Sequence, residues 1–291
     1  MDAIDLLKNR RSFRNFSDIP IDDDVLNNIL EVGLNAASGG NTQPCTIIKI
    51  RDKDKKSKLK DLLGQNFIEK CDIVLVFLLD FYKQKRWCEL NSAPYGRNRS
   101  FLEFIISLED VMCVAQSIEC ACTLKGIGSV YLGTPNLRYE EIKELLELPE
   151  LTIPVLAMCL GNVKGTLNSR KKLQKDAVIF DEKYKKLNDD EIERYYEEKY
   201  QNNNTYINDK NSYLIDELYN IASMVGGKDF ADKVKANVEK NGYINPAQKL
   251  FGLHYNPIEM IGMNQWIWNF FKEQGFDFLD ETFHINRLDV K

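Results

Sequence analysis

Positive charge gathers in the stretch K-N-R-R-S-F-R, residues 8–14, of a chain whose formal net charge is −5. Arg10, Ser12 and Arg14 offer guanidinium forks and a hydroxyl, the groups that hold an anion such as a phosphate. Three interpretations of this stretch remain open: a solvated helix end, a patch for nucleic acid, or a socket for one small anion. A phosphate-bearing cofactor would explain compact positive charge in an acidic protein.

The remaining composition argues against several other kinds of chemistry. With 44 Asp and Glu against 39 Lys and Arg, the chain is not typical of a general nucleic-acid binder. Its two histidines, His254 and His284, have no partner at the spacing of a zinc site or a Ser-His-Asp triad. The seven cysteines include no C-x-x-C pair, so we interpret them as reduced core thiols. We expect no metal and no nucleic-acid partner.

A glycine-rich stretch, G-I-G-S-V-Y-L-G at 126–133, invites comparison with a dinucleotide-binding fingerprint. Its third glycine follows after four residues rather than two, and a strand rather than a helix is expected there. The sequence also contains no P-loop motif. Rossmann-type and kinase-type nucleotide binding are therefore not supported.

The elements that position these residues alternate between helices and strands. Helices are expected over residues 2–9, 20–37, 55–64, 102–124 and 140–148, and strands over 45–50, 72–80 and 154–162, with a loop and short strand at 126–135. This order predicts an α/β or α+β sheet with helices on its faces. Acidic residues interrupt the apolar stretch 102–124, which favours a central buried helix over a membrane span.

The chain changes character after about residue 165. A polar helix is expected over 189–200, a linker or loop over 202–211, and two or three helices within 212–280. The N-terminus lacks a basic region followed by an apolar run, so we expect no signal peptide and a cytoplasmic location.

Three motifs in one order carry a family resemblance: R-R-S-F-R-N-F at 10–16, A-S-G-G-N-T-Q-P at 37–44 and G-I-G-S-V-Y-L-G at 126–133. Together they resemble the nitroreductase superfamily of FMN enzymes. The stretches 64–80, 109–121 and 169–184 are similar to its oxygen-insensitive NADPH nitroreductase and flavin reductase branch. The resemblance covers roughly residues 2–200, and the tail matches much less well.

The resemblance implies an α+β fold, a nitroreductase-like three-layer α/β/α sandwich with a mixed, mainly antiparallel sheet. It implies a homodimer with FMN sites at the subunit interface. Residues 1–200 would form the FMN-binding core. Residues 201–291 would form a helical C-terminal extension packed on the core or on the partner subunit.

The resemblance also implies roles for individual positions in FMN binding. Arg10 and Ser12 would bind the phosphate, Arg11 between them would also belong to the cofactor site, and Arg14 would reach the ring near N1 and O2. Ser38, Asn41 and Gln43 would contact the flavin across the dimer, and Gln65 would bind its pyrimidine edge. Tyr131, Leu132 and Gly133 would lie beside the ring. Arg170 would close on the phosphate, while Asn168 stands where the family often has a second cation.

The implied activity is that of an FMN-dependent NAD(P)H oxidoreductase. Hydride would pass through flavin N5 by a ping-pong mechanism to nitroaromatics, quinones or free flavin, with no catalytic side chain. The stretch 200–211 lacks the arginines that hold the extra phosphate in NADPH-preferring relatives, so NADH or NADPH is possible, with Arg97 and Arg99 as substitute contacts. Two alternatives stay open: redox chemistry on a dedicated metabolite, or a non-catalytic flavin-binding or regulatory protein.

Overall fold

The computed structural model describes residues 2–166 and 170–279, so Asn168 and His284 lie outside the described residues. Contacts divide the chain into two compact units. The first comprises Met1–Ser169 with Trp268–Lys291, and the second comprises Arg170–Ile267. The contacts separate the two units after residue 169, so they do not test the predicted boundary after residue 200. That boundary stays a prediction about where the FMN-binding core ends.

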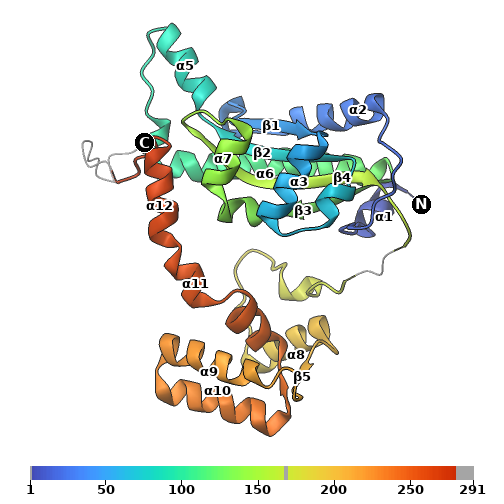
Figure 1. Cartoon of the computed structure of the whole chain (residues 1–291), viewed down its shortest axis with the longest axis vertical. Coiled ribbons are helices and arrows are strands. Elements are labelled where there is room, and N and C mark those ends of the chain that lie inside the picture. The colour runs from blue at the N-terminus through green and yellow to red at the C-terminus, as the bar shows by residue number, and fades with distance from the viewer. Residues whose placement is uncertain (1, 167–169, 280–291) are drawn as a thin grey trace. The chain divides into compact units, whose positions relative to one another are not determined.

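A four-stranded antiparallel sheet forms the centre of the first unit (Figure 1). Its strands are ordered β1 (Cys45–Ile50), β2 (Ile73–Asp80), β4 (Thr152–Asn162) and β3 (Ile127–Leu132). Every residue of β2 is buried, which explains its uninterrupted apolar run, since a strand covered on both faces needs no polar alternation. A parallel bridge between Ser12 and Ser129 continues the sheet beyond β3.

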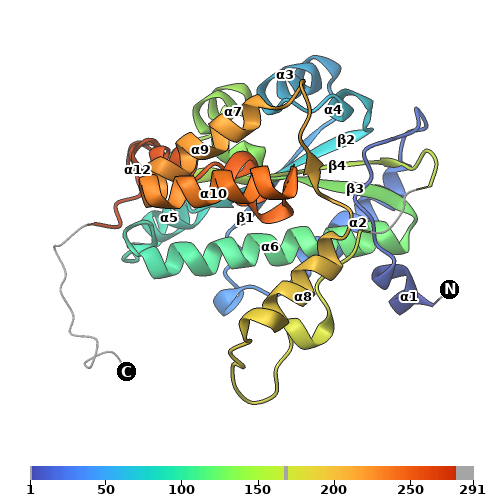
Figure 2. The ribbon, with the colours of Figure 1, turned by 90° about the horizontal axis from the view of Figure 1, so that it is seen from below.

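Helices cover both faces of this sheet (Figure 2). One layer contains α1 (Ala3–Lys8), α2 (Asp23–Leu34) and α6 (Phe101–Leu124), and the other contains α3 (Lys53–Leu63), α4 (Phe67–Lys70) and α7 (Tyr139–Leu146). A further helix, α5 (Tyr82–Leu90), extends from one end of the unit (Figure 1). The predicted three-layer α+β architecture is confirmed.

The central helix α6 lies close against α2, and the sequence provides for this approach. A Cβ atom built on Gly33 of α2 would lie 2.5 Å from Cγ1 of Ile118 on α6. Glycine is therefore required where the two helices meet, because any side chain would force Ile118 or a helix backbone to move. In residues 2–166 and 170–279, no helix is both long and apolar enough to cross a membrane.

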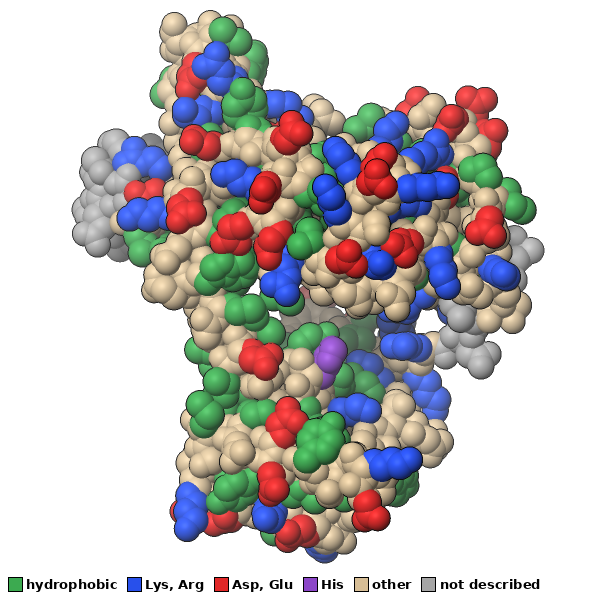
Figure 3. Space-filling view, in the orientation of Figure 1, with side chains coloured by type: hydrophobic (Ala, Val, Ile, Leu, Met, Phe, Trp, Pro, Cys, Tyr) green, Lys and Arg blue, Asp and Glu red, His purple; other side chains and the backbone are tan. Residues whose placement is uncertain are grey.

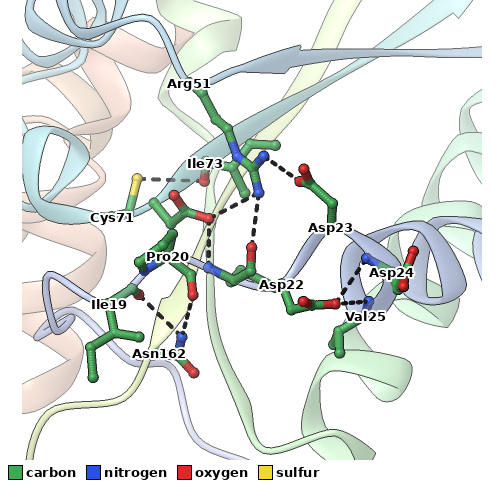
Figure 4. Close-up of polar contacts among 12 residues, drawn as sticks. Ile19, Pro20, Asp22, Asp23, Asp24, Val25, Arg51, Cys71, Ile73 and Asn162 are labelled. Carbon is green, nitrogen blue, oxygen red and sulfur yellow. Dashed lines mark hydrogen bonds and ion pairs between the residues drawn. The ribbon is translucent and has the colours of Figure 1, made fainter.

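A cluster of polar contacts fixes the chain where it enters α2 (Figure 4). The Arg51 guanidinium contacts the Asp23 and Asp72 carboxylates and donates to the Ile21 carbonyl. The Asn162 amide donates to the carbonyls of Ile19 and Pro20 at 3.1 and 3.0 Å. These contacts hold the segment that follows the basic cluster against the ends of β1 and β4.

The second unit is helical. It contains α8 (Asp189–Tyr200), α9 (Tyr213–Gly226), α10 (Lys228–Asn241), a π-helical segment (Gln248–His254), α11 (Pro257–Gly262) and the start of α12 (Asn264–Glu273). Leu218, Val238 and Ile244 form its small core. Two predictions need correction. The linker at 202–211 contains β5 (Thr205–Tyr206), which pairs with β6 (Tyr243–Ile244). Within residues 212–279 there are four α-helices, α9 to α12, rather than two or three.

Charges of both signs are mixed on the surface of the first unit. On the face shown in Figure 3, Lys and Arg side chains alternate with Asp and Glu. All seven cysteines are free, as expected, but the prediction that they are core thiols is correct only for Cys71, Cys122 and Cys159. Cys45, Cys88 and Cys120 are partly exposed, and Cys113 is exposed. Across the described ranges, no group of three or more His, Cys, Asp or Glu side chains is placed to hold a metal ion.

Burial of Cys122 predicts a loss of stability at high pH. Burial raises the pKa of its thiol from 9.0 to about 12, so between these values the unfolded chain binds fewer protons than the folded one. The free energy of unfolding should therefore fall as pH rises from about 9 to 12, by about 1.4 kcal/mol per pH unit for this group. Urea titrations should show a shallower decline in Cys122→Ala, whereas Cys113→Ala, at an exposed position of the same helix, should leave the slope unchanged.

Candidate functional site

Arg10 is paired with a buried carboxylate rather than solvated. Helix α1 ends at Lys8, so Arg10 lies in the segment that leaves it. Its Nη1 lies 3.1 Å from Oε1 of Glu119 and 3.4 Å from Oγ of Ser12. The Glu119 side chain is 1% exposed and the Arg10 side chain 29%. This arrangement does not fit a solvated helix end, because the charge is directed into the protein.

Ser12 lies at the edge of the sheet beside β3. It pairs with Ser129, and the amide of the next residue, Phe13, donates to the Ser129 carbonyl at 2.9 Å. The Ser129 hydroxyl in turn donates to Oε1 of Glu119 at 3.4 Å. Backbone pairing with β3 therefore sets the position of the Arg10–Ser12 segment.

Tyr131 joins the same network from the end of β3. Its hydroxyl donates to Oε1 of Gln116 at 3.3 Å, and Nε2 of Gln116 donates to Oε2 of Glu119 at 3.0 Å. Burial raises the pKa of Tyr131 well above its usual value, so the phenol stays protonated. A Cβ atom on Gly133 would meet no atom of the chain within 4 Å, so the backbone beside it is open to a ligand. The Leu132 side chain instead packs in the core.

Arg14 lies at the junction of α3 and α4. Its guanidinium carbon is 5.9 Å from the centroid of the Phe67 ring, a cation–π distance. Gln65 precedes Phe67 by two residues and is half-buried. The structure therefore brings these two predicted site residues to one junction.

Arg11 supplies an observation that points to an anion. Its Nη1 donates to the Arg10 carbonyl at 3.0 Å, but its Nε is buried and has no hydrogen-bond partner. A buried donor without a partner costs roughly 1–3 kcal/mol. Arg11 stands between Arg10 and Ser12, whose partly exposed guanidinium and hydroxyl are donors that a phosphate group would take, so the residues present fit one.

The loop Ser38–Gln43 has an unusual backbone that several contacts hold. Asn41 and Gln43 have φ values of 56° and 47°, which non-glycine residues rarely adopt. The Ser38 hydroxyl accepts from the Gln43 amide at 3.1 Å, and the Gly39 amide donates to Oδ1 of Asp110 at 2.9 Å. Such strain persists only where surrounding contacts fix it, and it is often found at functional sites.

Within a single chain, the Ser38–Gln43 loop and Arg10 are held at different points along α6. The loop is anchored at Asp110 and the Arg10 network at Glu119, both on α6. These anchors are nine residues apart, which corresponds to roughly 13 Å along a helix. Arg170 belongs to the second unit, so its assignment rests on the family resemblance alone.

Sequence reasoning missed several members of the site. In the sequence, Asp110 and Glu119 are two of the acidic residues that interrupt the apolar stretch 102–124, and nothing in the local pattern marks Gln116 or Ser129. The sequence did contain a signal for the two acids. Asp110 and Glu119 lie on a helix with many apolar residues, and a carboxylate buried there needs a hydrogen-bond or ion-pair partner. Their partners, Arg10 and Gly39, are distant in sequence, so the pattern alone did not identify them.

Loss of the Asp110 carboxylate should loosen the strained loop. Asp110→Ala removes the acceptor for the Gly39 amide, so we expect a loss of about 1–3 kcal/mol in the free energy of unfolding. Asp110→Asn keeps an oxygen acceptor and should lose less. Hydrogen exchange should report faster exchange of the Gly39 amide in Asp110→Ala. Unchanged exchange would show that Asp110 does not hold the loop.

Residues 7–162, more than half of the chain, match the Nitroreductase family. The chain belongs to the nitroreductase family. The match includes the Arg10 network, the Ser38–Gln43 loop and strands β1 to β4. All predicted site residues except Arg170 therefore lie within residues 7–162, the part of the chain that matches the family.

Individual relatives agree with this nitroreductase assignment. An NADPH-dependent oxidoreductase of Staphylococcus haemolyticus is 28% identical over 217 residues, 67% of this chain and 83% of that protein. The structure of B. megaterium NfrA2 matches with a TM-score of 0.68 and 26% identity over 96% of this chain and 99% of that one. NADPH:FMN oxidoreductase from Vibrio harveyi, solved with NAD+, gives a TM-score of 0.61 and 29% identity over 66% and 82% of the two chains.

Proposed function

We propose that this nitroreductase-family protein is an FMN-dependent NAD(P)H oxidoreductase. The observation that carries the proposal is the network in which Glu119 links Arg10 and Ser129, with the unpartnered donor of Arg11 beside it. We assign this network to the phosphate end of the flavin site, and Tyr131, which Gln116 joins to it, to the ring end. The relatives named NADPH-dependent oxidoreductase and NADPH:FMN oxidoreductase support the same activity.

The chain's own residues then bind and orient the cofactor. Bound FMN would accept and donate hydride at N5, so the protein needs no acidic or nucleophilic side chain for the chemistry. Arg10 and Ser12 would hold the phosphate with Arg11 between them, and Arg14 would stabilise negative charge on the ring. Gln65 would bind the pyrimidine edge, and the backbone from Tyr131 to Gly133 would lie beside the ring.

A homodimer is part of this proposal. The Ser38–Gln43 loop is anchored at Asp110, nine residues from Glu119 on α6, and the family resemblance assigns it to the partner's flavin. Helix α6 also exposes apolar side chains on one face, with Phe101, Ile105 and Met112 at 52%, 38% and 43% exposure. Burying that face against a second copy would complete two equivalent sites.

The electron donor is NADH or NADPH, and the acceptor is a small molecule such as a nitroaromatic, a quinone or free flavin. Arg97 is a poor candidate for binding the extra NADPH phosphate. Its guanidinium donates to Glu103 at 2.8 Å and to Gln84 at 2.7 Å, and it lies 5.1 Å from the Phe81 ring centroid. A cytoplasmic location stays a prediction from the sequence.

The visible spectrum of the purified protein, followed by anaerobic addition of NADH or NADPH, tests this function. We expect a yellow protein that bleaches, and the faster donor identifies the preferred nicotinamide. A yellow protein that neither donor reduces would favour a flavin-binding or regulatory role, or a different donor. A colourless protein that takes up no added FMN would refute the proposal.

A further inference from the structure

Glu119 is a buried carboxylate whose two oxygens are both engaged. Oε1 accepts from Arg10 and Ser129, and Oε2 accepts from Gln116. These donors come from the segment after α1, from β3 and from α6 itself. Through Gln116 the network also reaches the Tyr131 hydroxyl. One side chain therefore links the residues proposed for the phosphate end to those proposed beside the ring.

We propose that Glu119 is a positioning residue that orients Arg10 for a phosphate monoester. This inference rests on the proposed function, because it takes the Arg10–Ser12 segment as the phosphate end of the site. Glu119 holds Nη1 of Arg10, whose side chain remains 29% exposed, so its other N–H groups stay available to an external anion. Glu119 itself, at 1% exposure, does not reach the ligand.

A purely structural role explains the carboxylate poorly. Removing a carboxylate and a guanidinium from water costs several kcal/mol per ion, and apolar side chains of similar volume often stabilise a protein equally well or better. On a helix whose other buried positions include Val111, Ala115 and Ile118, an apolar residue would fill this place at lower cost. What the carboxylate adds is a fixed direction for the Arg10 fork.

The pairing also affects how the site recognises phosphate. Glu119 holds one N–H group of Arg10 and so fixes the plane of the guanidinium, which directs its other N–H groups as charge-assisted donors to a phosphate. A variant in which Arg10 is no longer held in this orientation should therefore show a smaller preference for FMN over a flavin without phosphate. Its contacts with the rest of the flavin should be unchanged. Riboflavin, which lacks the phosphate, is the matched probe for those contacts.

The test is the ratio of FMN to riboflavin affinity, measured by fluorescence quenching of the full chain. We expect the wild-type protein to prefer FMN, and Glu119→Ala to reduce that preference roughly tenfold while riboflavin affinity stays within about threefold. Glu119→Met, which fills a similar volume, should behave like Glu119→Ala. Glu119→Gln keeps an acceptor for Arg10 and should retain most of the preference. Glu31→Ala, at an exposed carboxylate of α2, is the control.

Each outcome decides the inference. A folded Glu119→Ala or Glu119→Met that keeps the full preference would overturn it, and so would a parallel loss of FMN and riboflavin affinity. If both variants fail to fold, Glu119 is structural and the inference is also overturned. A wild-type protein that binds no flavin, or shows no preference for FMN, would instead refute the proposed function.

Discussion

Arg10→Ala is expected to weaken FMN binding by roughly ten- to a hundredfold. A hydrogen bond between a charged donor and a charged acceptor contributes about 1.5–3 kcal/mol, and the variant removes the guanidinium that we assign to the phosphate. Ser12→Ala should weaken binding less, because it removes one neutral donor. Equilibrium titration with FMN measures both. Lys8→Ala is the matched control, since Lys8 is an exposed cation at the end of α1.

Stability must be separated from affinity in this experiment. Arg10→Ala leaves Glu119 buried without its ion-pair partner, which costs about 3–5 kcal/mol when one member of a buried pair is removed. The double variant Arg10→Met with Glu119→Leu should regain most of that free energy of unfolding yet still bind FMN weakly. A folded Arg10→Ala protein with unchanged FMN affinity would remove Arg10 from the phosphate site.

Introducing charge on the exposed face of α6 is expected to dissociate the proposed dimer and to release its flavin. Ile105 and Met112 are seven residues apart and expose 38% and 43% of their area on that face. In the double variant Ile105→Glu with Met112→Glu, dimer formation would bury each new carboxylate without a partner, at a free-energy cost of roughly 3 kcal/mol. The dimer dissociation constant should therefore rise by at least about a hundredfold.

Sedimentation at several concentrations, with the flavin-to-protein absorbance ratio, measures this effect. Ile4→Glu and Met224→Glu are controls, because both side chains are more than half exposed and lie on α1 and α9 rather than on α6. These two control variants should change neither the mass measured by sedimentation nor the flavin content of the protein. Stable monomers that stay loaded with flavin, in wild type or variant, would contradict a site shared between subunits.

Local sequence patterns determined most secondary structure of the first unit. The apolar spacing of α2, the unbroken apolar run of β2 and the acid-punctuated α6 were predicted from residues alone, and each element is present. This succeeds because helix and strand periodicity depend on near neighbours in sequence. The tail was predicted less well, since β5 and β6 pair across residues 206 and 243, a contact that no local pattern reveals.

The site divides in the same way. The sequence by itself determined that Arg10, Ser12 and Arg14 could hold an anion, because that follows from the donors that these side chains carry. Only the tertiary structure decided that Arg10 faces a buried Glu119 and that Asp110 holds the Ser38–Gln43 loop. Both carboxylates join residues more than 70 positions apart, so their environment exists only after α6 packs against the chain. The same acids that interrupt an apolar stretch in the sequence are, in the fold, what positions the proposed site.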